Sequence, residues 1–187
     1  MLDYNEIKPR KYIIFRDEPY EVVDSHVFRK QQRKPVNATK LKNLITGKVV
    51  ENSFHQSDKV EEAEIVSRKV KYLYRNKGEI WLSDLENPKD RFSIKEELAG
   101  PAINFVKENS EVEVLSFDNN VINLKVPIKT ELEVKVAPPA VKGNTAQGGV
   151  KQITLETGAV VNAPLFINEG DIVRINTENG EYVERVS

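Results

Sequence analysis

With 187 residues, 39% of them hydrophobic and 30% charged, the chain is long enough for two to three small domains and apolar enough to bury a core. It has no cysteine, which excludes disulfides, thiolate nucleophiles and zinc sites built on cysteine. No run reaches the roughly 18 apolar residues of a membrane-spanning helix, and the first residues lack a signal-peptide pattern, so we expect a cytoplasmic protein.

The formal net charge of −1 hides an uneven distribution of charged residues. Residues 1–50 carry 11 basic and 6 acidic side chains, whereas residues 51–187 carry 17 basic and 23 acidic ones. No acidic residue occurs between Ser25 and Val50. Such a local positive field attracts phosphate, although a solvated charged hairpin explains the charge alone equally well.

The first expected domain, residues 1–63, is a small barrel of strands. Apolar and polar residues alternate here with the period of two that is typical of strands. The expected strands cover residues 12–15, 20–28, 39–44 and 48–54, with a turn at Thr46 and Gly47.

The second expected domain, residues 64–126, combines strands with one short helical segment. Strands are expected from residue 64 to 74, at 79–82, and in a hairpin of residues 111–115 and 121–124. Residues 95–106 have helical character, and Pro101 must kink or split that segment. Strands around one short helix suit a five-stranded OB barrel.

The third expected domain, residues 127–187, is again built of short strands separated by glycines. Its first strand, residues 131–136, is followed by a loop rich in proline and glycine at 137–149, and further strands are expected at 152–155, 159–161, 171–175 and 181–183. Two similar units in tandem suggest a duplicated barrel, so the sequence predicts an all-β fold.

The residues that catalysis requires are missing from the pattern. His26 and His55 lie far apart in the sequence and have no partner at a ligand-like spacing. Carboxylate pairs such as Glu61 with Glu62 are sequence neighbours and do not converge on one bond. The glycines at 143–149 precede no helix, so a flexible loop is favoured over a phosphate-binding loop. We therefore expect neither an enzyme nor a metal or cofactor site.

Seven residues at the end of the first hairpin are the strongest candidate for a binding site. They are Arg29, Lys30, Gln31, Gln32, Arg33, Lys34 and Pro35. Each residue of a flanking strand adds about 3.3 Å, so the strands can hold this loop away from the barrel. Four cations around two uncharged amides suit contacts with an RNA backbone, and the absence of aromatic residues argues against base stacking by the loop.

Fixed spacings along the chain resemble those of bacterial elongation factor P. The most specific stretch runs from Leu155 to Val161 and continues through residues 164–167, Gly170 and residues 180–183. In the first domain, residues 18–20 and 40–44 fit the family pattern without a gap, and in the second domain residues 72–74 and 78–79 fit it. The likeness covers essentially the whole chain and thins at residues 83–91.

The resemblance implies an SH3-like (KOW-like) barrel followed by two OB-fold barrels. It also implies a monomeric, non-enzymatic translation elongation factor without a cofactor, which binds the ribosome between the P and E sites. Such a factor contacts the acceptor end and elbow of the P-site tRNA, with mRNA at the E site as a further partner. It relieves stalling at consecutive prolines.

The resemblance also assigns site residues. It places Gln31, Gln32 and Arg33 in a tip loop near the peptidyl-transferase centre. Residues expected to bind tRNA or rRNA are Arg29, Lys30, Lys34, Lys40, Lys42, Tyr182 and Arg185. The loop expected near the E-site codon is Gly143, Asn144, Thr145 and Ala146, in which Asn144 replaces the usual aspartate and keeps an acceptor.

The tip of the hairpin departs from the family pattern. The family carries a lysine or arginine there, which receives a modification that extends its reach, whereas gap-free counts from Tyr20 and from Lys40 both place Gln32 at this position. Glutamine has neither the amine nor the guanidinium that those modifications need. Either the tip works unmodified, or Arg33 or Lys34 replaces it, or another modification exists; we favour the first.

Two rival functions remain open. The chain can be a general single-stranded RNA-binding protein that uses its OB barrels without the ribosome, although residues 51–187 are net acidic and such proteins display positive grooves. A hydrolytic enzyme is the second rival, which convergent carboxylates in a deep pocket would favour.

Overall fold

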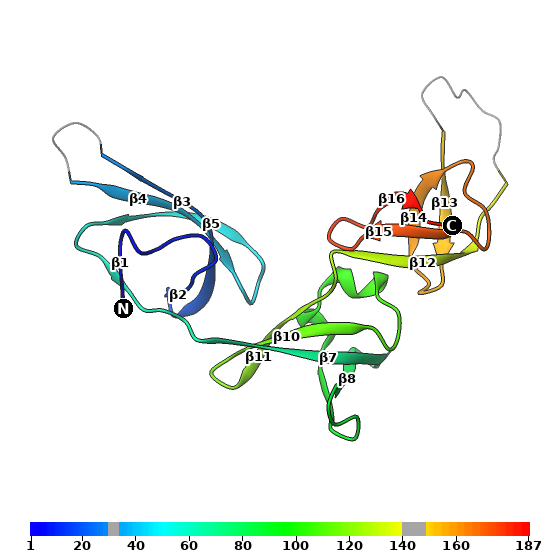
Figure 1. The fold of residues 1–187 in the computed structure, drawn as a ribbon, viewed down its shortest axis with the longest axis horizontal. Coiled ribbons are helices and arrows are strands. Elements are labelled where there is room, and N and C mark those ends of the chain that lie inside the picture. The colour runs from blue at the N-terminus through cyan, green and yellow to red at the C-terminus, as the bar shows by residue number, and fades with distance from the viewer. Residues whose placement is uncertain (30–33, 140–148) are drawn as a thin grey trace. The chain divides into compact units, whose positions relative to one another are not determined.

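The computed structural model describes residues 1–29, 34–139 and 149–187. Strands dominate these residues, and the only helices among them are two short 3-10 segments, as Figure 1 shows. The predicted all-β fold is therefore confirmed. The described part of the chain contains no helix long and apolar enough to cross a membrane.

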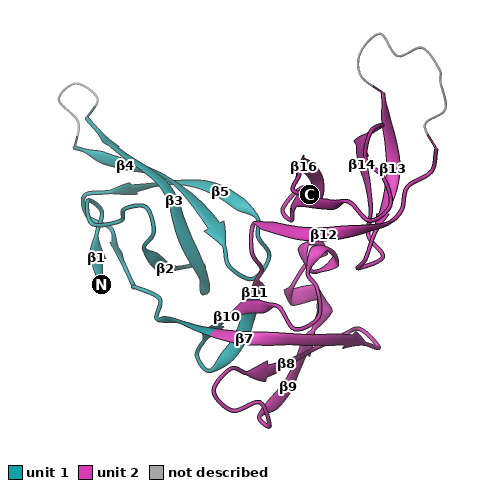
Figure 2. Cartoon of the chain, turned by 45° about the vertical axis from the view of Figure 1, so that its right-hand side comes forward, with its two compact units in different colours: residues 1–68, 114–123 teal, residues 69–113, 124–187 magenta. Residues whose placement is uncertain are grey.

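Two compact units make up the described chain (Figure 2). The first comprises Met1–Arg68 and Val114–Asn123, and the second comprises Lys69–Glu113 and Leu124–Ser187. The domain boundaries expected near residues 63 and 126 stay a prediction.

The first unit is built around a four-stranded antiparallel sheet. Its strands, in spatial order, are β2 (Tyr12–Phe15), β3 (Glu18–Phe28), β4 (Val36–Asn43) and β5 (Val49–His55). A short ladder joins β1 (Leu2–Asp3) to β6 (Lys59–Val60), and β6 also contacts β2. The core of this unit consists of Leu2, Ile7, Ile13, Tyr20, Val22, Leu41, Phe54 and Val60.

Strand β4 is longer at its start than the sequence pattern predicts. It begins at Val36 rather than near residue 39, because residues 36–38 pair with β3 on one side and with β5 on the other. Along β4 the residues alternate strictly, so that Asn37, Thr39, Leu41 and Asn43 are buried. Lys40 and Lys42 point the other way and are exposed.

A second sheet contains the strands of the central region. Its spatial order is β11 (Asn120–Lys125), β10 (Glu111–Phe117), β7 (Ile65–Asn76), β8 (Glu79–Asp84) and β9 (Arg91–Lys95). Asp118 and Asn119 both have positive φ, which matches a two-residue turn whose twist suits a hairpin. Strand β9 follows the polar stretch after β8, where the sequence pattern indicated no strand.

The helical segment expected at residues 95–106 is split in two, as Pro101 required. The first part is η1 (Glu96–Leu98) and the second is η2 (Pro101–Phe105), with Gly100 between them at a φ of 60°. Proline suits the start of η2, because it has no N–H to leave unpaired. Ile103 of η2 is buried, and Phe105 packs against the core of the third sheet.

The third sheet carries the C-terminal strands. Its spatial order is β14 (Val160–Pro164), β13 (Val150–Leu155), β12 (Lys129–Val136), β15 (Ile172–Asn176) and β16 (Glu181–Arg185). The two edge strands, β14 and β16, contact each other, so the sheet closes on itself. Its core consists of Leu132, Val134, Ile153, Leu155, Val161, Ala163, Ile167, Val173 and Ile175.

Candidate nucleic-acid interface

The candidate loop is carried by an arm, which we define as residues 24–28 of β3 and 36–40 of β4. The two strands pair in register up to Phe28 and Val36, and Figure 1 shows them running side by side to this end. A shift of register between Val22 and Asp24 marks the base of the arm. Such bulges bend a strand and increase its twist, so the bulge helps to set the direction of the arm.

Lys40 of the arm and Lys42, two residues further along β4, lie on the exposed face of this strand. Lys40 lies opposite Asp24 on β3 and Glu51 on β5, and its Nζ is 3.8 Å from Oε1 of Glu51. Lys42 lies opposite Glu21 on β3. The structure thus brings carboxylates from outside the acid-free stretch beside both lysines. Exposed pairs of this kind are weak, and both ammonium groups stay accessible to a phosphate.

Arg29 and Lys34 lie at the two ends of the described arm, and both are exposed. Lys30, Gln31, Gln32 and Arg33 lie outside the described residues, as do Gly143, Asn144, Thr145 and Ala146. Of the seven candidate residues, the structure therefore describes Arg29, Lys34 and Pro35.

The two histidines belong to the same three-stranded part of the first sheet. His26 pairs with Ala38 of β4, and His55 pairs with Val36 of the same strand from the other side. The His26 ring stacks on Phe28, with centroids 6.1 Å apart and planes at 18°. Among the described residues, no group of three histidine or carboxylate side chains is arranged to hold a metal ion.

In the third sheet, the two predicted RNA-binding residues have different surroundings. Tyr182 is half-buried against the core, whereas Arg185 is exposed. The Arg185 guanidinium lies 5.7 Å from the centroid of the Phe166 ring, and its Nη1 is 3.7 Å from Oδ2 of Asp171. Phe166 is 58% exposed, which is unusual for a phenylalanine. Sequence reasoning missed this ring as a site residue, because its exposure cannot be read from the motif around it.

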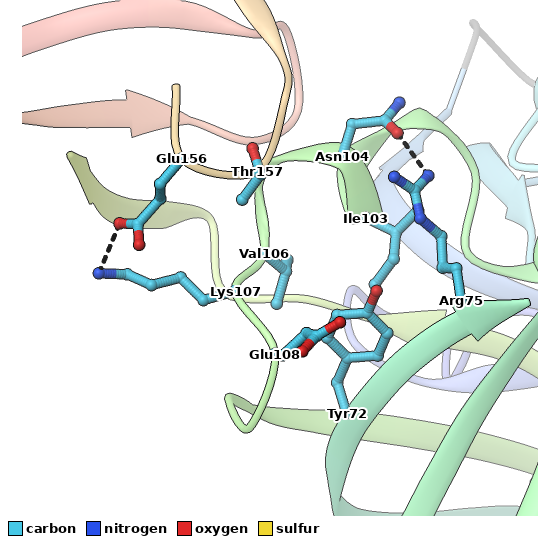
Figure 3. Close-up of a pocket in the computed structure, with 9 residues that line it drawn as sticks. All are labelled: Tyr72, Arg75, Ile103, Asn104, Val106, Lys107, Glu108, Glu156 and Thr157. Carbon is cyan, nitrogen blue, oxygen red and sulfur yellow. Dashed lines mark hydrogen bonds and ion pairs between the residues drawn. The ribbon is translucent and has the colours of Figure 1, made fainter. Parts of the chain in front are cut away.

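A cleft of about 470 Å³ in the second unit allows the enzyme alternative to be examined (Figure 3). Its two carboxylates, Glu108 and Glu156, do not face each other: Glu156 turns toward Lys107, and Glu108 lies by Tyr72. Glu156 accepts a hydrogen bond from the Glu133 N–H at 2.9 Å, and its Oε1 lies 2.9 Å from Lys107 Nζ.

The pKa shifts and charged contacts in this cleft are also those of a structural contact rather than of a catalytic site. Burial tends to raise the pKa of Glu156, but the Glu133 N–H and the Lys107 ammonium outweigh it, so this pKa lies below its ordinary value. Burial raises the pKa of the Tyr72 hydroxyl. Arg75 donates through Nη1 to Asn104 Oδ1 at 2.7 Å and to Glu96 Oε1 at 2.9 Å. A general base needs a pKa near the working pH, and the lowered pKa of Glu156 moves it away from that range.

Comparison with known families matches three consecutive parts of the chain. Residues 3–60 match the elongation factor P KOW-like domain, residues 65–124 its OB domain, and residues 130–185 its C-terminal domain. The predicted order of an SH3-like barrel followed by two OB-fold barrels is thereby confirmed.

Curated relatives agree with these domain matches. Elongation factor P of Carboxydothermus hydrogenoformans is 39% identical over 186 residues, with complete coverage of both chains. That of Thermodesulfovibrio yellowstonii is 37% identical and covers 100% of this chain and 99% of its own.

Among solved structures, the eukaryotic translation initiation factor 5A from Methanococcus jannaschii aligns with a TM-score of 0.51 at 16% identity. The alignment covers 66% of this chain and 92% of that one. At this level of identity the likeness concerns the fold alone.

Proposed function

The chain belongs to the elongation factor P family of translation factors, and on this premise we propose that it binds between the ribosomal P and E sites and positions the P-site tRNA for peptide-bond formation. Its proposed task is to relieve stalling at consecutive prolines. Proline is a constrained and poor nucleophile, so a factor that orients the tRNA end lowers an entropic barrier. The ribosomal RNA carries out the peptide transfer, and the factor supplies no catalytic group of its own.

The observation that carries this proposal is the arm of the first sheet. Its paired strands end at Phe28 and Val36, and the exposed Arg29 and Lys34 lie directly beyond them. An arm of paired strands, flanked by β5 and with cations at its end, suits insertion along an RNA surface, because the cations contact phosphates while the strands fix the direction. Lys40 and Lys42 extend the cationic side of this arm toward the tRNA.

We further propose that Gln32 acts without a modification. A carboxamide donates and accepts hydrogen bonds, so it can contact the tRNA end or rRNA although it cannot be lengthened. In this arrangement Arg29, Lys30, Arg33 and Lys34 provide most of the binding free energy, and Gln31 and Gln32 provide polar contacts near the peptidyl-transferase centre.

The C-terminal barrel is proposed to make the remaining RNA contacts. The Arg185 guanidinium over the exposed Phe166 ring offers a cation and an aromatic face together, which suits a ribose-phosphate backbone or an unpaired base. Tyr182 and the loop Gly143, Asn144, Thr145 and Ala146 complete this part, with the loop directed to mRNA at the E site. We propose three domains, at residues 1–63, 64–126 and 127–187, in a monomeric cytoplasmic protein.

Replacement of Arg29, Lys30, Arg33 and Lys34 together by alanine tests the proposal. We expect rescue of a polyproline reporter to fall at least about tenfold, because the cations that hold the loop on RNA are lost. The matched control replaces four exposed lysines elsewhere, Lys48, Lys89, Lys95 and Lys129, and keeps the same net charge change. Equal rescue by both variants would refute the role of the loop.

Co-sedimentation separates this function from the rival one. A translation factor of this kind binds 70S ribosomes that carry P-site tRNA, and the four-alanine loop variant binds them less tightly than the four-lysine control. Tight binding to free single-stranded RNA without association with ribosomes would instead establish the general RNA-binding function.

A further inference from the structure

A fully buried asparagine, Asn37, lies near the outer end of the arm. It is the inward-facing residue of β4 closest to the end of the described arm, next to Val36. Its cross-strand neighbour on β5 is Phe54, which belongs to the apolar core of the first unit. A side chain at 0% exposure beside such a core is normally apolar, so the carboxamide needs a specific reason.

The Asn37 amide holds the N-terminal loop. Its Nδ2 donates one hydrogen bond to the Tyr4 carbonyl oxygen at 2.7 Å and another to the Ile7 carbonyl oxygen at 2.9 Å. Both hydrogens of the amide are therefore used on a segment that is about 30 residues away in the sequence. The carboxamide orientation is fixed, because the opposite orientation would point an oxygen at two carbonyl oxygens.

The other end of the same amide is not satisfied. Among the described residues, Asn37 Oδ1 has no hydrogen-bond partner although it is buried. A buried acceptor without a partner costs about 1–3 kcal/mol, which offsets much of what the two donated bonds contribute. Net stability therefore explains this residue poorly, whereas a need for one defined arrangement of arm and loop explains it well.

The loop that Asn37 holds is itself fixed on its far side. Leu2 and Asp3 pair with Val60 and Lys59, and the Ile7 side chain is completely buried in the core. The N-terminal loop is thus tied to β6 by its first residues and to the arm by Asn37. This makes it a brace for the outer end of the arm.

We propose that Asn37 is a positioning residue, which fixes the direction of the arm by hydrogen-bonding β4 to the N-terminal loop. The inference rests on the proposed function, in which the arm brings the tip to the tRNA end. Val36 alone separates Asn37 from the start of β4, so its two hydrogen bonds hold the arm directly at the end that carries the loop. Displacements of about 1 Å can cost two orders of magnitude in reactions that depend on orientation.

The brace matters more in this chain than in one with a modified tip. A lysine lengthened by a flexible modification can search for its target, whereas the Gln32 side chain is short. The barrel must then fix the direction of the arm. Among the described residues, Asn37 is a polar side chain that joins the arm to the N-terminal loop.

Two substitutions on β4 separate positioning from stability. Asn37→Val keeps a buried, strand-compatible side chain and removes both bonds to the loop. Thr39→Val is the matched control: Thr39 lies two residues further on the same face, is 3% exposed and donates to the Asn52 carbonyl oxygen within the sheet at 3.0 Å. Asn37→Thr retains one donor and serves as the milder variant if Asn37→Val does not fold.

The first measurement is the distance between the end of the arm and the far end of its sheet. Because the chain has no cysteine, the changes Lys34→Cys and Lys48→Cys give a unique pair of spin labels at the end of the arm and at the far end of its sheet. We expect pulsed electron paramagnetic resonance to show a broadened or shifted distance distribution in Asn37→Val and an unchanged one in Thr39→Val. Equal distributions in all variants would overturn the brace.

The second measurement uses the unlabelled full chain and purified ribosomes. In peptide-bond formation with a proline donor and acceptor, we expect Asn37→Val to lower the maximal rate about 3- to 10-fold with little change in the half-saturating factor concentration. Asn37→Thr should fall between Asn37→Val and the parent chain, and Thr39→Val should match the parent chain.

Failure of the inference and failure of the proposed function look different. If the parent chain does not accelerate proline addition, the proposed function is wrong, and the spin-label distances still decide whether the brace exists. If the parent chain is active and Asn37→Val has the same maximal rate as Thr39→Val, Asn37 is not a positioning residue.

Discussion

Gly180 lies directly against the ring of Phe105: a Cβ atom at residue 180 would be 2.9 Å from the Phe105 Cζ atom. Gly180 also has a φ of +71°, a conformation that residues with a Cβ adopt with strain. The contact joins η2 to the core of the third sheet, where Phe105 packs. Gly180, which opens the family-like stretch of residues 180–183, is thus needed both for the turn between β15 and β16 and to leave room for the Phe105 ring.

Gly180→Ala is expected to lower the free energy of unfolding by about 2–4 kcal/mol, because left-handed backbone costs about 1 kcal/mol and overpacking adds about 1–3 kcal/mol. Gly158→Ala is the matched control, since Gly158 has a φ of +84° but no atom within 4 Å of the position that an alanine methyl group would occupy. It should lose only about 1 kcal/mol. Urea unfolding of both variants measures the difference, and equal losses would show that the Phe105 contact costs nothing.

Glu156 should contribute to stability in a pH-dependent way. Its pKa in the folded protein is lowered, with the Glu133 N–H and Lys107 outweighing the effect of burial. Its contribution is therefore present above the unfolded-state pKa of about 4.3 and is lost as the pH falls through the lower folded-state value. We expect Glu156→Gln to flatten the decline of stability between neutral pH and about pH 3. Thermal unfolding across this range measures how stability changes with pH. The control is Glu97→Gln, because Glu97 is exposed. Parallel profiles for the parent chain and Glu156→Gln would contradict the prediction.

Native protein should carry no modification on its tip loop. Gln32 has no amine or guanidinium to receive the extensions known from the family, and the proposed contacts come from unmodified cations. Intact-mass measurement on protein from the native source, followed by peptide mapping of residues 29–35, should give the mass of the unmodified sequence. A mass increase on Arg33 or Lys34 would move the functional tip to that residue.

Strand periodicity predicted most of the fold, because the side chains of a half-buried strand alternate whatever their tertiary partners are. It failed where neighbouring strands, and not the local sequence, decide the conformation. Residues 36–38 form strand because β3 and β5 flank them, and β9 pairs with β8 although a polar stretch separates them. At residues 95–106 the composition indicated helix, and the proline with its preceding glycine divided it into two short turns.

The sequence by itself determined the all-β class and the cationic stretch after β3 with its two glutamines, because these depend on residue type, period and position along the chain. The tertiary structure decided which residues meet. It placed carboxylates beside Lys40 and Lys42, set Phe166 under Arg185, and brought the Asn37 amide to the carbonyls of Tyr4 and Ile7. Contacts between residues far apart in the chain depend on strand pairing and register, which local periodicity does not encode.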